Sequence, residues 1–377
     1  MKNLRIIFSV SLIAVTLFIQ SCQKNEPNSA QSGTGILPAR FKVEIPASLS
    51  SAATTTKSVS ATNADTIKGN AIYQNLKTFI AVGEGAGDIV EKIIGAIALY
   101  HIDRPMVLSY QSNDDNRVKN LVVKENIEYN GRTWRYMLTI TDAASEGEAD
   151  GGKAMQILWN PTPIEGIAIL RPYNIDRDKN KASLDATLRI EYSEIATNDY
   201  DSHMIVDIAN LPLPDARIDQ FALHSLKMFV GKKGNNVDVS GNSDHPNAKF
   251  FTESAGFDWA FAASGLTAEN IGVAEVGIPP STLDNSTRKV LLDDYSIKNV
   301  LTIQINKWYF DITGFHIDVT ELSKYLQNAD APGYFDNAGF IQAGKSPDAK
   351  YDALASRIKL LTPFNPKSVN ELTIDFK

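Results

Sequence analysis

The sequence lacks the short motifs that identify many catalytic sites. Neither the G-x-S-x-G turn of a nucleophilic serine nor the H-E-x-x-H pattern of a zinc protease occurs, although the chain has five histidines. A glycosidase-type pair of carboxylates stays open, because the fold rather than the spacing brings such a pair together. With 44 acidic residues, the sequence nominates no particular pair. We therefore expect a non-enzymatic protein and assign no catalytic residue.

Cysteine is also scarce, and acidic residues outnumber basic ones. Cys22 is the only cysteine among 377 residues, so the chain cannot form an internal disulfide. The formal net charge is −7, which gives the chain no general attraction to nucleic acid or to anionic lipid. We expect no nucleic-acid partner. The hydrophobic content of 43% is enough for a sizeable core.

The first 21 residues contain the only pronounced apolar run near the N-terminus. Lys2 and Arg5 precede an uncharged stretch from Ile6 to Ile19. This stretch is shorter than the roughly 20 residues that a membrane-spanning helix needs. A basic head, a short apolar middle and a small residue at the end are typical of a secretory signal peptide. The pattern predicts that residues 1–21 are a signal peptide.

The tetrapeptide Ile19-Gln20-Ser21-Cys22 resembles the lipobox of bacterial lipoproteins. Gln20 departs from the small or β-branched residue usual at its position. The resemblance implies cleavage before Cys22, a lipid on its thiol and an acylated N-terminus, which together hold a membrane firmly. Gln23 replaces the aspartate that retains such proteins at the inner membrane. The protein is therefore expected on the outer membrane, at its periplasmic face or at the cell surface.

Composition divides the remaining chain into a tether and a folded body. Residues 22–67 are rich in Ser, Thr and Ala and bury too little apolar area to fold alone. Residues 40–46 are the exception, because their apolar side chains alternate and predict a strand. We expect a helix plus antiparallel β domain over 68–212 and a second β-rich part over 213–377. One continuous domain is the alternative.

The clearest local prediction is a β-hairpin centred on Asn130-Gly131, the preferred two-residue type I′ turn. This turn places Ile127 opposite Trp134 and Val123 opposite Leu138. The apolar residues then share one face, so turn chemistry and alternation agree on the register.

Many further short strands with few helices predict a mainly β (α+β) fold. We expect antiparallel sheets forming a sandwich or curled barrel, with one amphipathic helix over 88–100 before the sheet. Asp88 is expected to cap this helix, after a hinge containing Gly83, Gly85 and Gly87. Short helices are expected within 318–330 and 346–361. The remaining strands are expected over 153–160, 166–172, 186–194, 204–210, 222–230, 256–264, 271–278, 299–312 and 369–376.

One segment has oxygen-bearing side chains at alternate positions, as in calcium-binding loops: Asp176, Asp178 and Asn180. Lys181 stands where an EF-hand loop needs glycine, and Thr187 stands where that loop has its bidentate glutamate. A polar turn between two strands explains the same pattern. We keep calcium as a hypothetical cofactor with these three residues as ligands. His245 lies in another polar stretch and is expected to be solvated, whereas the tryptophans are expected in the core.

Three functions are compatible with these features. The first is a non-enzymatic binding module for a glycan, a lipid or another small ligand. The second is a structural or assembly subunit of the envelope or of a fimbria-like surface structure, in which residues 40–46 add as a strand to a partner's sheet. The third is a secreted hydrolase with two facing carboxylates in a cleft. The expected partners are outer-membrane lipid through Cys22 and an unidentified small ligand or envelope protein.

Overall fold

The computed structural model describes residues 36–50, 67–98, 102, 104–219, 221–248 and 256–377. They form two compact units. The central unit comprises Gly83–Pro212, Thr373–Lys377 and the segment that ends at Val43; the C-terminal unit comprises Glu44–Val82 and Leu213–Leu372. The predicted signal peptide and the lipobox with Cys22 lie outside the described residues. No helix in the described ranges has both the length and the apolar character needed to cross a bilayer.

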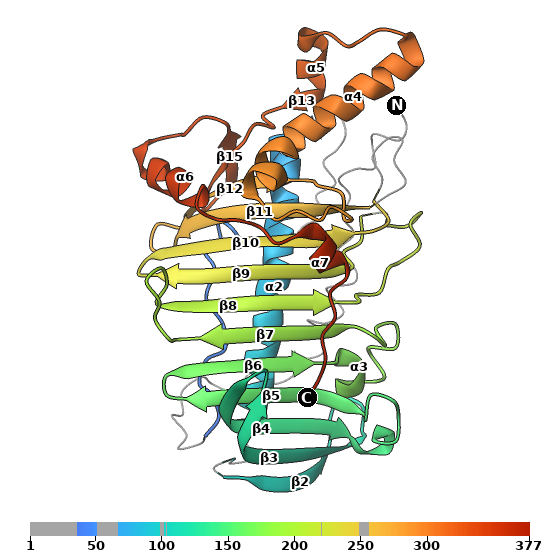
Figure 1. The fold of residues 1–377 in the computed structure, drawn as a ribbon, viewed down its shortest axis with the longest axis vertical. Coiled ribbons are helices and arrows are strands. Elements are labelled where there is room, and N and C mark those ends of the chain that lie inside the picture. Colours follow the sequence, from blue (N-terminus) through green and yellow to red (C-terminus); the bar gives the residue numbers. More distant parts are fainter. Residues whose placement is uncertain (1–35, 51–66, 99–101, 103, 220, 249–255) are drawn as a thin grey trace. The chain divides into compact units, whose positions relative to one another are not determined.

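The central unit is built on an antiparallel meander in which each strand pairs with its neighbours in sequence (Figure 1). Its strands are β2 (Met106–Gln111), β3 (Val118–Tyr129), β4 (Arg132–Asp142), β5 (Lys153–Pro161), β6 (Ile164–Leu170), β7 (Thr187–Ser193) and β8 (Ser202–Ala209). A short 3₁₀ turn, η3 (Ala143–Ser145), follows β4, and helix α3 (Pro172–Ile175) follows β6.

The predicted hairpin is confirmed as β3 and β4. Ile127 pairs with Trp134 and Val123 pairs with Leu138, as the two-residue turn requires. Asn130 and Gly131 both have positive φ, 50° and 71°, which is the backbone of a type I′ turn. Trp134 is 1% exposed, so the apolar face of the hairpin faces the core.

The C-terminal unit has a second antiparallel meander of four strands, and a small two-stranded hairpin pairs with the fourth of them. Its strands are β9 (Ser225–Lys233), β10 (Asn236–His245), β11 (Phe257–Leu266), β12 (Ile271–Gly277), β14 (Gly333–Asp336) and β15 (Gly339–Ala343). Its helical segments are η4 (Lys289–Asp294), α4 (Ile297–Thr313), α5 (Val319–Tyr325), η5 (Ala349–Tyr351), α6 (Asp352–Ile358) and α7 (Pro366–Asn370). A separate two-residue parallel pair joins β1 (Ile67–Lys68) to β13 (Leu326–Gln327).

These elements confirm a mainly β fold with antiparallel sheet, an N-terminal helix and short C-terminal helices. The strand order is linear, so the sheet does not close into a barrel. The N-terminal helix, α2 (Gly69–Ala98), is longer than expected. It runs without interruption through Gly83 and Gly85, so the predicted hinge and the helix start at Asp88 are wrong. The Asp88 carboxylate instead accepts a hydrogen bond from Lys42 Nζ at 2.5 Å.

Two extended segments near the ends of the chain are packed on the body without joining a sheet. Phe41, Val43 and Ile45 are at most 7% exposed, yet residues 40–46 pair with no strand. The predicted C-terminal strand over 369–376 is also absent: α7 ends at Asn370, and an extended tail follows. In that tail Ile374 is buried, and the backbone N–H of Lys377 donates to Gln156 Oε1 at 2.7 Å. The alternation of apolar residues therefore reflects burial of one side of each segment. Burial of one side does not require hydrogen bonds to a neighbouring strand.

Residues 299–312, predicted as a strand, belong to helix α4 instead. Leu301, Ile303 and Ile305 alternate, but Ile297, Leu301 and Ile305 also follow helical spacing, and these last three are buried. Gly314 ends the helix with φ 74° and donates its N–H to the carbonyl of Phe310 at 2.8 Å. This glycine C-cap is the local signal that distinguishes the helix from a strand.

Candidate functional site

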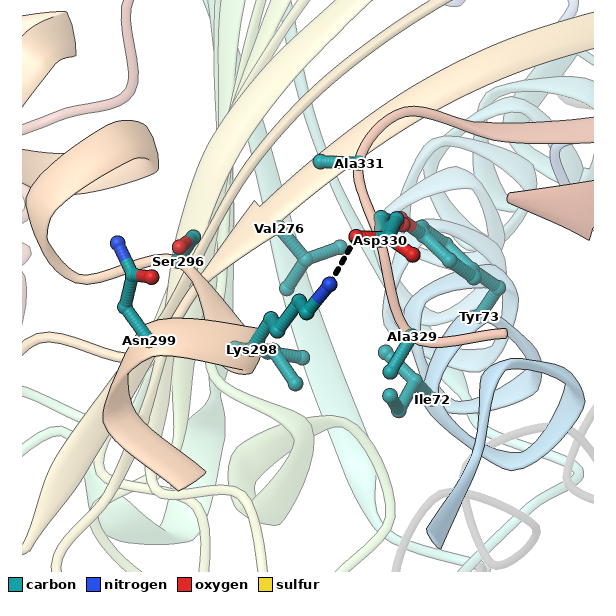
Figure 2. Close-up of a pocket in the computed structure, with 10 residues that line it drawn as sticks. Ile72, Tyr73, Val276, Ser296, Lys298, Asn299, Ala329, Asp330 and Ala331 are labelled. Atoms are coloured by element: carbon teal, nitrogen blue, oxygen red, sulfur yellow. Dashed lines mark hydrogen bonds and ion pairs between the residues drawn. The ribbon is translucent and has the colours of Figure 1, made fainter. Parts of the chain in front are cut away.

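A cavity of about 160 Å³ lies within the C-terminal unit, where the first turn of α2 meets the start of α4 and the segment before β14 (Figure 2). One wall is apolar, and the other carries hydroxyl, amide, ammonium and carboxylate groups. The lining residues are Ile72, Tyr73, Val276, Ser296, Ile297, Lys298, Asn299, Ala329, Asp330 and Ala331.

Tyr73 is a buried aromatic side chain at this cavity. Its ring stacks on Phe340 at 5.2 Å and meets the edge of Phe335 at 5.6 Å between centroids. A β-carbon on Gly333 would come within 2.5 Å of the Tyr73 ring, so only glycine fits at that position. The Tyr73 hydroxyl donates to the backbone carbonyl of Asp330 at 3.0 Å. Burial, with the nearby charge of Glu275, raises the pKa of Tyr73, which keeps the hydroxyl protonated.

Lys298 and Asp330 form the polar side of the cavity. Their side chains are joined by an ion pair, and each is about half exposed, so the pair borders solvent (Figure 2). An ammonium group offers three donors, and an ionised carboxylate offers only acceptors. A ligand beside them would therefore meet a donor and an acceptor with no net local charge.

Two hydroxyl groups lie at this cavity, those of Tyr73 and Ser296. The Tyr73 hydroxyl is held by a carbonyl and stays protonated, and no histidine lines the cavity to activate Ser296. The volume is below the roughly 300 Å³ at which sites for drug-sized ligands begin. Only a ligand about the size of one small ring, or one end of a larger molecule, fits inside.

The residues of the calcium hypothesis do not converge on a common point. Asp176 Oδ1 accepts the backbone N–H groups of Asp178 and Lys179 at 3.1 and 3.0 Å, which closes its own turn. The Asp178 side chain is 70% exposed and lies 3.6 Å from Lys181. Asn180 turns its amide nitrogen inward, donating to the carbonyls of Pro172 and Asp176 at 3.0 Å each. Among the described residues, no group of three or more His, Cys, Asp or Glu side chains could hold a metal ion.

An ionic cluster stands beside that turn. Lys119, 2% exposed, donates from Nζ to Asp115 Oδ2 at 2.8 Å, to Asp142 Oδ2 at 2.9 Å and to the carbonyl of Asn174 at 2.9 Å. Arg117 donates two further hydrogen bonds to the Asp142 carboxylate, both at 2.6 Å. Burial acts to raise the pKa of Asp142, but the hydrogen bonds from Arg117 and Lys119 outweigh it and hold that pKa well below its usual range.

His245 is buried, so the prediction that it is solvated in a polar turn is wrong. It is the last residue of β10 and is 0% exposed. Its ring nitrogens lie 2.8 Å from the Phe221 carbonyl and 2.9 Å from the Ser243 hydroxyl, and Phe79 of α2 packs against the ring at 4.9 Å. Burial lowers the pKa of His245 to about 4, so the imidazole is neutral at physiological pH. Trp134, Trp159 and Trp259 are buried, as expected, whereas Trp308 of α4 is only partly buried.

Two buried carboxyl groups face each other directly across the β10–β11 ladder. Asp244 pairs with Asp258 in register, and both are 0% exposed. Their partners are neutral or distant: Ser281 donates to Asp244 at 2.7 Å, Asn242 donates to Asp258 at 3.3 Å, and His224 Nδ1 lies 3.6 Å from Asp244. Burial, and then the charge of Asp244, raise the pKa of Asp258 well above its usual range. Asp258 therefore keeps its proton to a higher pH than an ordinary aspartate, because the pKa of this carboxyl group is raised.

A hydrolase requires its two carboxyl groups to reach a substrate. Asp258 has the raised pKa that such a mechanism uses, but Asp258 and Asp244 both lie under the protein surface rather than in a cleft. Other buried acids on this face have strong bases: Arg357 donates to both carboxylate oxygens of Asp238, at 2.7 and 2.8 Å. Asp244 and Asp258 have no such base. We therefore expect this pair to make the stability of the C-terminal unit depend on pH.

We expect Asp258→Asn to stabilise the C-terminal unit at pH 7 by about 1.5–3 kcal/mol, because a neutral amide can donate to the Asp244 carboxylate. In the natural chain, the folded state binds the proton more tightly than the unfolded state. The unfolding free energy should therefore fall as pH rises above about 4, the ordinary range of an aspartate pKa, towards the raised folded value. Urea denaturation between pH 4 and 8 measures both effects, and the variant should lose most of this slope.

Asp238→Asn is the matched control, since it makes the same substitution at a buried acid on the neighbouring strand, β10. It removes the charge that balances Arg357 and should lower the unfolding free energy. If Asp258→Asn destabilises the unit as much as Asp238→Asn does, the raised pKa of Asp258 is refuted.

Tyr73, Lys298 and Asp330 had no signal in the sequence, because none belongs to a motif. Tyr73 and Asp330 are separated by 257 positions and meet only through the fold. Comparison with protein-family models, with curated proteins and with solved structures gives no match to this chain.

Proposed function

We propose that this chain is an exported lipoprotein, anchored to the outer membrane through Cys22, that binds a small ligand without converting it chemically. The observation that carries the binding function is the cavity of about 160 Å³ between Tyr73 and the Lys298–Asp330 pair. Its mixture of apolar wall and few polar groups is typical of small-molecule sites. The anchor rests on the lipobox resemblance of Cys22.

The lining favours a neutral, hydroxyl-bearing ligand among the candidates. The Lys298–Asp330 pair can donate to and accept from adjacent hydroxyl groups, as on one sugar ring. The neutral balance of the pair gives no preference to a charged ligand. Lipids with acyl chains exceed the volume of the cavity. A glycan terminus is therefore the ligand class that we propose.

We expect Lys298→Ala to weaken binding of such a ligand about 10- to 100-fold, because one hydrogen bond from a charged group contributes roughly 1.5–3 kcal/mol. Native mass spectrometry of protein from the host envelope identifies the bound mass, and calorimetric titration with the matching monosaccharide measures its affinity. Lys289→Ala is the matched control, since Lys289 also forms an ion pair with an aspartate, Asp294, and does not line the cavity.

Equal affinities of the Lys298→Ala and Lys289→Ala variants would refute this binding site. A natural chain that binds no member of a monosaccharide panel would refute the proposed ligand class. The anchor is tested separately by fractionating cells that produce the Cys22→Ala variant, which should appear in the soluble fraction.

A structural or assembly role is the second candidate. The observation in its favour is a group of exposed apolar side chains on and around α4 and α5, which project from the sheet of the C-terminal unit (Figure 1). These residues are Ile303, Phe310, Ile312, Phe315 and Val319, which are 46–83% exposed. Strand donation by residues 40–46 would first require Phe41, Val43 and Ile45 to leave the chain's own core. The exposed helical segments are the better contact for a partner.

A further inference from the structure

The cavity described above lies at the base of a projecting part of the C-terminal unit. We call this part, residues 300–328, the arm; it contains most of α4, all of α5 and β13 (Figure 1). The chain enters the arm through residues 296–299 and leaves it through residues 329–331, and both of these attachments line the cavity. A ligand that fills the cavity therefore lies against both attachments of the arm.

The outer part of the arm has little contact with the core of the unit. Residues 306–328 are all described by the structure, and Ile317, 8% exposed, is the only buried residue among them. The Phe310 ring stacks on His316 of the same arm at 4.9 Å between centroids. At the far end, β13 is held by a two-residue pair with β1. Segments with few buried side chains open locally more readily than the core does. The stability of the arm therefore depends strongly on its attachments.

The Lys298–Asp330 ion pair connects the two attachments directly. Lys298 is in the first turn of α4 and Asp330 is in the segment before β14, 32 positions later (Figure 2). Each side chain is about half exposed, so the pair changes an equilibrium constant by no more than about fivefold. Leu301 and Ile305, which are buried, fix the first half of α4 more firmly. The ion pair is the part of this attachment that a ligand in the cavity can reach.

The first turn of α4 also lacks a side-chain cap. Ser296 stands at the N-cap position, but its side chain makes no capping hydrogen bond. In α5, by contrast, Asp318 accepts the N–H groups of Thr320 and Glu321 at 2.8 and 3.0 Å. The N–H groups of a first turn have no partner inside their own helix. Because residues 296–299 line the cavity, a hydroxyl oxygen of a ligand can accept one of these N–H groups and supply the missing cap.

We propose that the cavity controls the arm: a ligand that bonds to both attachments closes the base of the arm and stabilises α4 against local opening. This regulation rests on the small-ligand binding proposed above. Helix formation is cooperative, so a bond at the first turn stabilises the turns beyond it. The arm carries exposed apolar side chains, those of Ile303, Phe310, Ile312, Phe315 and Val319. Occupancy of the cavity therefore sets how firmly this apolar surface is held.

Hydrogen exchange measured by mass spectrometry tests this control, in the full chain with Cys22→Ser so that the protein is soluble. The probes are glucose, galactose and N-acetylglucosamine, each first titrated by calorimetry. Opening of α4 dismantles the site, so a bound probe at ten times its dissociation constant should slow exchange in α4 about tenfold. Exchange in β9 and β10 should not change. A probe that binds by calorimetry and leaves exchange in α4 unchanged overturns the control of the arm, while the binding itself stands.

Asp330→Asn tests the same control without a ligand. It removes the charged partner of Lys298 and leaves the sequence of α4 unchanged, so exchange in α4 should become about two- to fivefold faster. Asp284→Asn is the matched control and should leave exchange in α4 unchanged. Asp284 also connects two segments of this unit, through Asn365 Nδ2 at 2.7 Å and Lys367 Nζ at 3.6 Å, and it does not line the cavity.

The two experiments separate failure of this control from failure of the proposed function. Faster exchange in α4 for Asp330→Asn alone supports the control of the arm by its base. Equal exchange in α4 for Asp330→Asn and Asp284→Asn overturns it. If none of the probes binds, the proposed ligand class fails, and the comparison of the two variants decides the control by itself.

Discussion

Replacing Lys119 with methionine is expected to lower the unfolding free energy of the central unit by about 3–5 kcal/mol, which is the usual cost of removing one partner from a buried ion pair. The Lys119 ammonium group is enclosed and bound to Asp115, to Asp142 and to the carbonyl of Asn174. Methionine fills a similar volume but leaves these acceptors without that donor. The loss should be largest near neutral pH, where the Asp142 carboxyl group is ionised.

The pH dependence of this effect has a definite sign. The pKa of Asp142 is held below its ordinary value in the folded state by Arg117 and Lys119. This carboxylate therefore contributes stability above about pH 4, its ordinary unfolded range, and the contribution is lost as pH falls towards the depressed folded value. In the Lys119→Met variant part of the depression is removed, so the difference from the natural chain should narrow in acid.

Lys124→Met is the matched control, because Lys124 is exposed on the same strand, β3. We expect a change within about 0.5 kcal/mol for it. Chemical denaturation monitored by tryptophan fluorescence compares the variants, since Trp134 and Trp159 are buried in the central unit. A Lys119→Met variant as stable as Lys124→Met would show that the buried cluster does not hold this unit together.

The second large effect is expected from Phe41→Ala, which should cost about 3–5 kcal/mol, as for other buried aromatic residues truncated to alanine. Phe41 is 0% exposed and packs 6.0 Å from the ring of Tyr192. Its ring also occupies the space above Gly166, where a β-carbon would lie within 2.7 Å of it. Its backbone N–H donates to Glu91 Oε1 of α2 at 2.8 Å. The segment therefore connects the sheet and the helix of the central unit.

Phe315→Ala serves as the comparison, because Phe315 has the same side chain and is 74% exposed. Its truncation should change stability by no more than about 0.5 kcal/mol. Thermal or urea denaturation of the two variants shows whether residues 40–46 are a structural segment or part of a tether. If Phe41→Ala is as mild as Phe315→Ala, then residues 40–46 are dispensable to the fold and free to act as a donor strand.

Local turn chemistry explains why the hairpin could be predicted residue by residue. Asn130 and Gly131 adopt the positive φ values that their type favours, and the two-residue loop then leaves one register that keeps the apolar residues together. Both requirements act within about twenty residues of chain. No distant contact had to be known.

Alternation was less reliable where no turn accompanied it. Residues 40–46 and the tail after Asn370 alternate because one side of each segment is buried, yet neither pairs with a strand. In α4 the apolar residues satisfy both a period of two and helical spacing, and the neighbouring core decides between them. Strand β10 was not predicted, for the opposite reason: its polar residues are typical of a loop. In the structure, α6, α7 and the segment joining them cover these residues, and Arg357 balances the charge of Asp238.

The sequence by itself determined the mainly antiparallel β fold and the register of its central hairpin, because turn residues and alternation act locally. It also carries the lipobox resemblance on which the proposed anchor rests. Only the tertiary structure decided which polar residues are buried and what they meet. Tyr73 and Asp330 line the same cavity, and Asp244 faces Asp258 without a strong base, because the fold brings separate strands and helices together. Burial is a property of the assembled chain, and burial raises the pKa of Tyr73 and of Asp258.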